Sequence, residues 1–117
     1  MYYKDMEVWK EAIELTINVY KITETYPKNE VFGIVSQIRR AVVSIPSNIA
    51  EGCARYSDKD TNKFIDIALG SIAELDTQLI IAQDLGFAVY DKNLINLVNK
   101  VTALLQGLKK YINTSGT

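Results

Sequence analysis

One stretch of this chain gathers side chains suited to recognising a phosphate group or the edge of an RNA base. It reads QIRRAVVSIPSNIAEGCAR and covers residues 37–55. Arginines separated by small hydroxyl and amide groups can donate hydrogen bonds to phosphate oxygens and base edges. On a helix the polar residues of this stretch share one broad face, with Arg39 on its flank: Gln37, Arg40, Ser44, Ser47, Asn48, Glu51 and Arg55.

Two other interpretations of the same face stay open. The face is a solvated surface if Glu51 and Arg55, four residues apart, form an ordinary ion pair along the helix. It is an interface if the small residues Ser44 and Ser47 let another helix come close. For such a face, contact with another helix is the most frequent outcome, followed by solvent and then by nucleic acid.

A second polar group falls within residues 58–85. A glutamate with a glutamine four residues later can hydrogen-bond polar groups of the first stretch, such as Arg40 or Asn48. A pair of metal ions held between bundle helices usually needs Glu-x-x-His motifs, and this chain has no histidine. We therefore predict a buried polar network rather than a metal site, made of Glu51, Ser71, Glu74 and Gln78.

The composition argues against catalysis. Without histidine the chain lacks the commonest general base and metal ligand, and its single cysteine, Cys53, has no second thiol to pair with. Gly33 and Gly52 do not form a phosphate-binding loop. We predict no catalytic residue, metal or cofactor. The net charge of −1 gives no overall attraction to nucleic acid or membrane, so such binding would need a local basic patch.

The elements that must position these residues are four helices. Apolar residues recur every three or four positions over residues 5–26, 30–56, 58–85 and 92–112. Pro27 ends the first helix, Ser57 with Asp60 caps the third, and Gly86 stops it. Pro46 lies inside the second helix, where we expect a kink because the apolar stripe keeps its phase across the proline.

Short connections place consecutive helices side by side, which predicts an all-α, up-down-up-down antiparallel four-helix bundle over a single domain, residues 1–117. In residues 5–26 a second apolar stripe containing Trp9 and Tyr20 widens the apolar arc to more than half of the helix, enough to contact another subunit. No signal peptide is recognisable at the N-terminus and no apolar run reaches membrane-spanning length, so we expect a cytoplasmic protein with no membrane contact.

Three blocks of the sequence resemble a known family. VWKEAIEL, QIRRAVVSIPSNIAEG and FIDIALGSIAELDTQLIIAQDLGF are similar to the four-helix-bundle proteins encoded within intervening sequences of bacterial large-subunit ribosomal RNA genes. The resemblance spans nearly the whole chain. It implies a left-handed antiparallel bundle and a ring-like homo-oligomer, a pentamer.

The same resemblance extends to the accessory variability protein of diversity-generating retroelements. That branch implies binding to a reverse transcriptase and contact with nucleic acid through a positive surface. The matching positions here are Arg39, Arg40 and Arg55, supported by Ser44, Ser47 and Asn48. We therefore expect a non-enzymatic oligomeric module that binds RNA or another nucleic acid. The alternative is a protein-binding scaffold without nucleic-acid contact.

Overall fold

The computed structural model describes residues 2–115, and over that range the chain is helical and contains no strand. Its α-helices pack on one another as a bundle, which confirms the predicted fold class. Two 3-10 helices precede the first two α-helices: η1 (Tyr3–Asp5) and η2 (Lys28–Glu30). The α-helices are α1 (Glu7–Thr23), α2 (Ile34–Cys53), α3 (Asp58–Asp84) and α4 (Lys92–Ser115).

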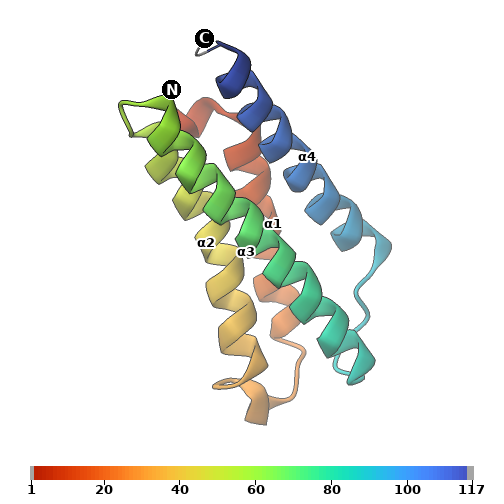
Figure 1. Ribbon diagram of the computed structural model, residues 1–117. Helices are drawn as coiled ribbons and strands as arrows, with labels where there is room; N and C mark the ends of the chain where they lie inside the picture. Colours follow the sequence, from red (N-terminus) through yellow and green to blue (C-terminus); the bar gives the residue numbers. More distant parts are fainter. Residues whose placement is uncertain (1, 116–117) are drawn as a thin grey trace.

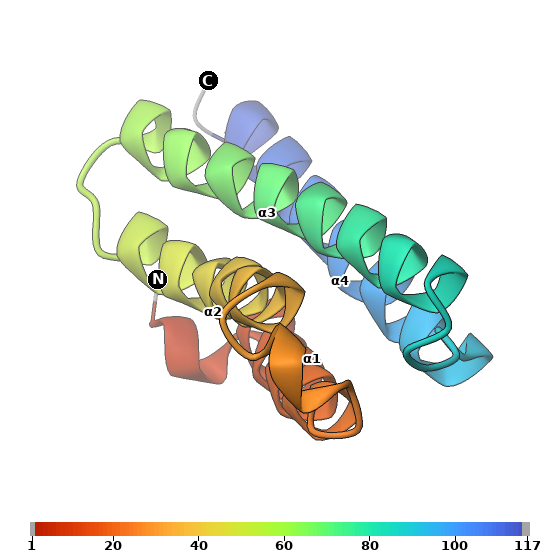
Figure 2. The ribbon, with the colours of Figure 1, turned by 90° about the horizontal axis from the view of Figure 1, so that it is seen from below.

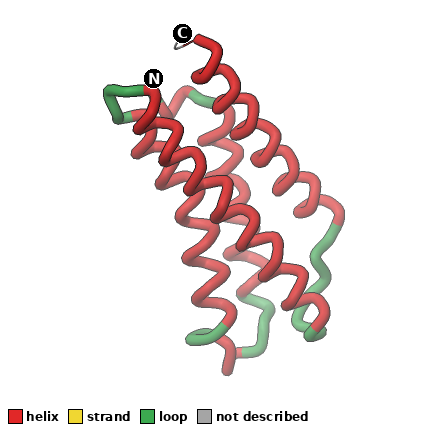
Figure 3. Tube along the Cα trace, viewed as in Figure 1, coloured by secondary structure: helices red, strands yellow, loops and turns green. Residues whose placement is uncertain are grey.

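Each α-helix packs against two others. α2 lies against α1 and α3, and α4 lies against the same two helices from the other side, with the α2–α3 contact the most extensive (Figure 2). The α1–α2 and α3–α4 connections lie at one end of the molecule, and the α2–α3 connection lies at the other (Figures 1 and 3). The bundle is elongated, with extents of 49 × 25 × 21 Å.

The core consists of the apolar stripes that the sequence pattern predicts. Every helix contributes fully buried aliphatic side chains to it, among them Leu15, Ile45, Leu75 and Leu105. Burying such a side chain stabilises the fold by roughly 1.5–3 kcal/mol relative to leaving it in water. None of the described helices combines the length and the apolar character that crossing a bilayer requires.

Three of the predicted helices have boundaries that are wrong by two to four residues. α1 is shorter than 5–26 at both ends, because Tyr3–Asp5 form a 3-10 turn and the chain leaves the helix after Thr23. α2 begins at Ile34 rather than 30, because residues 28–33 form η2 and a turn, and it ends at Cys53 rather than 56. α4 continues past 112 to Ser115, whereas α3 matches 58–85 to within one residue.

The predicted cap of α3 is formed, and α4 is capped as well. The Ser57 side chain accepts a hydrogen bond from the backbone N–H of Asp60 at 3.2 Å, and Asp91 accepts one from Leu94 at 2.8 Å. After α3, Gly86 has a φ of 81°, which favours glycine. The N–H of Phe87 then bonds the carbonyl of Ala82 at 3.0 Å, so the last carbonyls of α3 find partners.

The α3–α4 connection is anchored through Tyr90, which is buried. Its hydroxyl donates to Asp76 at 2.7 Å and its backbone N–H donates to the Gln83 side chain at 2.9 Å. Burial, and then the hydrogen bond to Asp76, raise the pKa of the Tyr90 hydroxyl far above its usual value. The Phe87 ring lies 5.8 Å from that of Tyr26, so both connections at this end of the bundle are in contact.

Pro46 is buried within a continuous α2. Because proline has no N–H, the carbonyl of Val42 loses its helical donor. The Thr16 hydroxyl of α1 lies 3.4 Å from this oxygen, although its better partner is the Ala12 carbonyl at 2.8 Å. The Thr16 hydroxyl of α1 therefore approaches the Val42 carbonyl oxygen, which lacks its usual N–H partner within α2. The kink at Pro46 and the handedness of the bundle stay predictions.

Gly52 allows the end of α2 to approach α3 closely. A Cβ atom at this position would lie 3.1 Å from the Cβ of Phe64 and 3.2 Å from the carbonyl oxygen of Thr61. The Thr61 hydroxyl also donates to the Gly52 carbonyl at 2.9 Å. The absence of a side chain at residue 52 therefore lets the end of α2 lie close to the start of α3.

Replacing Gly52 and Gly107 by alanine should change stability in opposite directions. Gly52→Ala forces α2 and α3 apart and should lower the free energy of unfolding by roughly 1–3 kcal/mol. A Cβ at Gly107, inside α4, meets nothing within 4 Å, so Gly107→Ala should raise it by roughly 0.5–1 kcal/mol. Urea unfolding followed by circular dichroism measures both, and equal shifts in one direction would contradict the close approach.

Candidate nucleic-acid interface

The predicted polar face of α2 does not form one continuous surface. Its residues fall into four environments. Arg39 is bound to the end of α1, Ser44 contacts α3, Arg40 stays open to solvent, and Arg55 lies beyond the end of α2. Each environment permits a different role.

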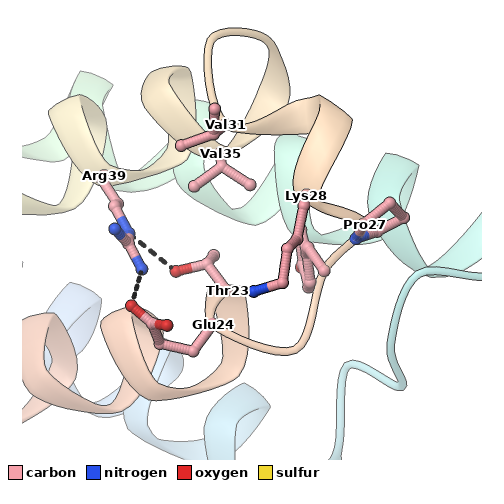
Figure 4. Close-up of a pocket in the computed structure, with 8 residues that line it drawn as sticks. Thr23, Glu24, Pro27, Lys28, Val31, Val35 and Arg39 are labelled. Atoms are coloured by element: carbon pink, nitrogen blue, oxygen red, sulfur yellow. Dashed lines mark hydrogen bonds and ion pairs between the residues drawn. The ribbon is translucent and has the colours of Figure 1, made fainter.

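Arg39 reaches from α2 to the last turn of α1 (Figure 4). Its Nε donates to the Thr23 hydroxyl at 3.0 Å, and its Nη2 donates to the Tyr20 carbonyl at 3.3 Å and to Glu24 at 3.1 Å. The guanidinium carbon also lies 4.4 Å from the centre of the Tyr20 ring. A cation at a helix C-terminus is favourable because the last carbonyls carry partial negative charge.

Arg39 is therefore a structural contact between α1 and α2. Its side chain is only 24% exposed, and its charge is paired with that of Glu24. The pocket beside it, lined also by Pro27, Lys28 and Val35, has a volume of about 300 Å³. Any role of Arg39 toward a ligand would have to act through this fixed position.

Ser44 joins α2 to α3, and Asn48 of the same helix bonds Ser44. The Ser44 and Ser71 hydroxyls are 2.9 Å apart, and the Asn48 amide donates to the Ser44 hydroxyl at 2.9 Å and to the Ser44 carbonyl at 2.8 Å. The Ser47 hydroxyl, although exposed, donates to the Val43 carbonyl at 2.8 Å. The structure thus brings together Ser44, Asn48 and Ser71, which sequence analysis had placed in two separate groups.

The predicted buried polar network is wrong in two of its members. Glu51 and Glu74 are exposed, because their positions on α2 and α3 point away from the core. Only Gln78 is buried, and its amide nitrogen lies 3.3 Å from a Glu74 carboxylate oxygen. Ser71 is half-buried and contacts Ser44 instead. Arg40 makes no hydrogen bond or ion pair with Glu74. The side-chain hydrogen bonds between α2 and α3 are made by hydroxyl groups instead.

Arg55 lies just beyond the other end of α2, in a segment where basic and acidic residues are equal in number. Its guanidinium carbon is 4.6 Å from the centre of the Phe64 ring, and its nearest carboxylate oxygen, on Glu51, is 3.9 Å away. From residue 51 to residue 63 the chain carries three basic and three acidic residues. Arg55 therefore does not stand in a net positive surface.

Arg40 is exposed and makes no ion pair or hydrogen bond within the described residues. Between residues 20 and 43 the chain has four basic residues and two acidic ones, in a protein whose net charge is −1. The segment that contains Arg40 thus carries a net positive charge, unlike the segment that contains Arg55. Of the three arginines predicted to contact nucleic acid, Arg40 alone combines exposure, a free guanidinium and a positive neighbourhood.

Phe32 is a surface residue that the sequence analysis missed. It is 95% exposed in the turn before α2, next to Arg40 in a groove between α1 and α2. The available signal was its position: it lies between Pro27 and the start of the apolar stripe of α2, outside any helical periodicity.

The described residues contain no group of three or more histidine, cysteine or acidic side chains able to hold a metal ion. The Cys53 sulfur lies 3.3 Å from the sulfur of Met6. Burial raises the pKa of the Cys53 thiol, although the N-terminal charge opposes this shift, and a raised pKa makes the thiol a poorer nucleophile at neutral pH.

The fold defines a class of protein: a small helical bundle, here with the exposed side chain of Arg40 on α2. The family model described as 23S rRNA-intervening sequence protein matches residues 4–109. The chain therefore belongs to the 23S rRNA-intervening sequence protein family, as its three sequence blocks predict. No curated protein matches the chain.

Arg39 and Arg40 are neighbours in sequence, and their replacement should have different effects on folding. Arg39→Ala removes hydrogen bonds to the end of α1 and should lower the free energy of unfolding by roughly 1–2 kcal/mol, a range reduced for partial exposure. Arg40→Ala should change it by less than about 0.5 kcal/mol. Urea unfolding of both variants decides this, and equal midpoints would show that Arg39 does not tie α1 to α2.

Proposed function

We propose that this protein is a non-enzymatic, homo-oligomeric module of the cytoplasm that binds RNA through the surface around Arg40. The observation that carries the RNA-binding part is the unpaired, exposed guanidinium of Arg40 in a locally positive region. Arginines placed in this way supply the phosphate contacts on which most nucleic-acid affinity depends.

Self-association is supported by a second surface, on α3. Three isoleucines of α3, Ile67, Ile80 and Ile81, are between 42% and 46% exposed, and Ile80 and Ile81 are adjacent. Exposed aliphatic side chains such as Ile80 and Ile81 suit a protein–protein interface. Repeating a modest RNA contact in each subunit of an oligomer would raise the overall affinity through avidity.

Charge on this α3 surface should break the oligomer. We expect the wild-type mass, measured by light scattering, to be a multiple of the 13.2 kDa chain mass, five times that mass for the pentamer. Ile80→Glu combined with Ile81→Glu should reduce it toward one chain, because the interface would bury charges without partners. Val89→Glu, at an exposed position in the α3–α4 connection, is the control and should leave the mass unchanged.

A monomeric wild-type protein would contradict self-association. A doubly substituted protein that keeps the wild-type mass would instead move the interface away from α3. If a second protein is bound to the wild type and is lost from the doubly substituted protein, α3 is the docking site for that partner. This last result would favour the scaffold function, which the same exposed isoleucines support.

RNA binding is tested by reversing charge at the two ends of α2. Labelled single-stranded RNA should bind wild-type protein with an affinity that falls between ~50 and ~200 mM salt. Arg40→Glu should weaken binding at the lower salt by about tenfold or more, because it removes a phosphate contact and adds repulsion. Arg55→Glu makes the same change in net charge and should weaken binding by less than about threefold.

Equal losses in the two variants would mean that only total charge matters and that Arg40 defines no site. No binding of wild-type protein at the lower salt would exclude the RNA function. Circular dichroism and light scattering on both variants would verify that fold and mass are unchanged, so that a loss of binding can be attributed to the surface.

A further inference from the structure

Two aromatic rings and two arginines line an open groove on the outer surface of α1 and α2. The groove has a volume of about 480 Å³, and Tyr20, Phe32, Arg39 and Arg40 lie along it with Val31 and Val43. It adjoins the pocket of Figure 4, in which Val31 and Val35 lie above the Arg39 contact. The groove therefore combines flat apolar surfaces with positive charge.

The two rings are held differently. Arg39 stacks against Tyr20 at 4.4 Å and is itself bound to Thr23 and Glu24, so the Tyr20 ring has a fixed neighbour. The Phe32 ring makes no aromatic contact within the described residues and is almost fully exposed. An exposed phenylalanine gains nothing from the fold, so its apolar faces are available to a partner.

We propose that this groove binds single-stranded RNA by stacking a base on Phe32 while Arg40 contacts the adjoining phosphate. This inference rests on the proposed RNA-binding function. It adds that the RNA is single-stranded and that Phe32 distinguishes it from a duplex. Proteins that bind single strands combine a positive groove with aromatic side chains on which bases stack. A base paired within a duplex has no free face for such a contact, so a duplex would use Arg40 alone.

Charge favours an RNA strand over an apolar peptide as the occupant. Residues 20–43 carry a net positive charge although the whole chain is slightly negative, and Arg40 has no acidic partner. A purely apolar partner would leave this arginine desolvated and unpaired. A phosphate beside the stacked base would instead compensate its charge.

The experiment compares two exposed aromatic residues at opposite ends of α2. Phe32→Ala removes the proposed stacking surface, and Tyr56→Ala removes a fully exposed ring next to Arg55, outside the groove. Fluorescence anisotropy would measure binding to a labelled oligouridylate of about 12 nucleotides and to an RNA duplex of the same length. Neither substitution touches the core, so both proteins should fold.

We expect Phe32→Ala to weaken oligouridylate binding by about fivefold or more, the lower end of the effect of losing one base stack, and to leave duplex binding unchanged. Tyr56→Ala should leave both affinities unchanged. A 4-thiouridine in the oligonucleotide should crosslink under long-wavelength light to a peptide that contains Phe32, which mass spectrometry would identify.

Each other result overturns the inference in a recognisable way. If Arg40→Glu weakens binding but Phe32→Ala does not, the RNA function stands and base stacking is wrong. If wild-type protein binds neither RNA, both the function and the inference fail. If Phe32→Ala changes the oligomer mass in light scattering, the groove is a contact between protein chains.

Discussion

The contact between Arg39 and the end of α1 holds one side of α2 against α1 and leaves the next residue, Arg40, on the exposed side. Successive residues of a helix point about 100° apart, so binding the guanidinium of Arg39 to Thr23 and Glu24 turns Arg40 toward solvent. The same contact holds Tyr20 against Arg39 at the edge of the groove that contains Phe32. One arginine thus stabilises the fold and determines where its neighbour is presented.

The other face of α2 depends on close contact with α3. At one end the absence of a side chain at Gly52 lets the two helices approach, and along their length the Ser44 and Ser71 hydroxyls meet. The polar residues of α2 therefore do not share one role. Those that face α3 join two helices, and those near the α1–α2 connection are available to a partner.

Much of the fold is encoded locally and was predictable. Helical periodicity gave the four helices, and the caps at Ser57 and Asp91 and the stop at Gly86 follow from the preferences of those residues. The boundaries of α1 and α2 were not predicted in this way, because a 3-10 helix over residues 28–30 and a turn over residues 31–33 lie where the periodicity indicated a longer α2. The family was also recognisable from three sequence blocks, and the family model agrees with it.

The candidate site was predictable only in part. A helical wheel places Arg39, Ser44 and Arg55 on or beside one polar face, but it does not show which side chains a neighbouring helix will bind. Glu51 and Glu74 were assigned to the interior because their spacing matched a polar network, yet both are exposed. Phe32 was overlooked because the predicted helix over residues 30–56 included it, whereas the structure places it in the turn before α2.

Hydrogen–deuterium exchange with and without oligouridylate tests most directly whether RNA binds at the α1–α2 end of the molecule. We expect slower exchange in the presence of RNA for backbone amides between residues 24 and 43, where the connection and the first turns of α2 border the groove. Amides of α3 and of the α2–α3 connection should be unaffected. Protection confined to residues 51–85, or no protection anywhere at RNA concentrations that saturate binding, would contradict the account.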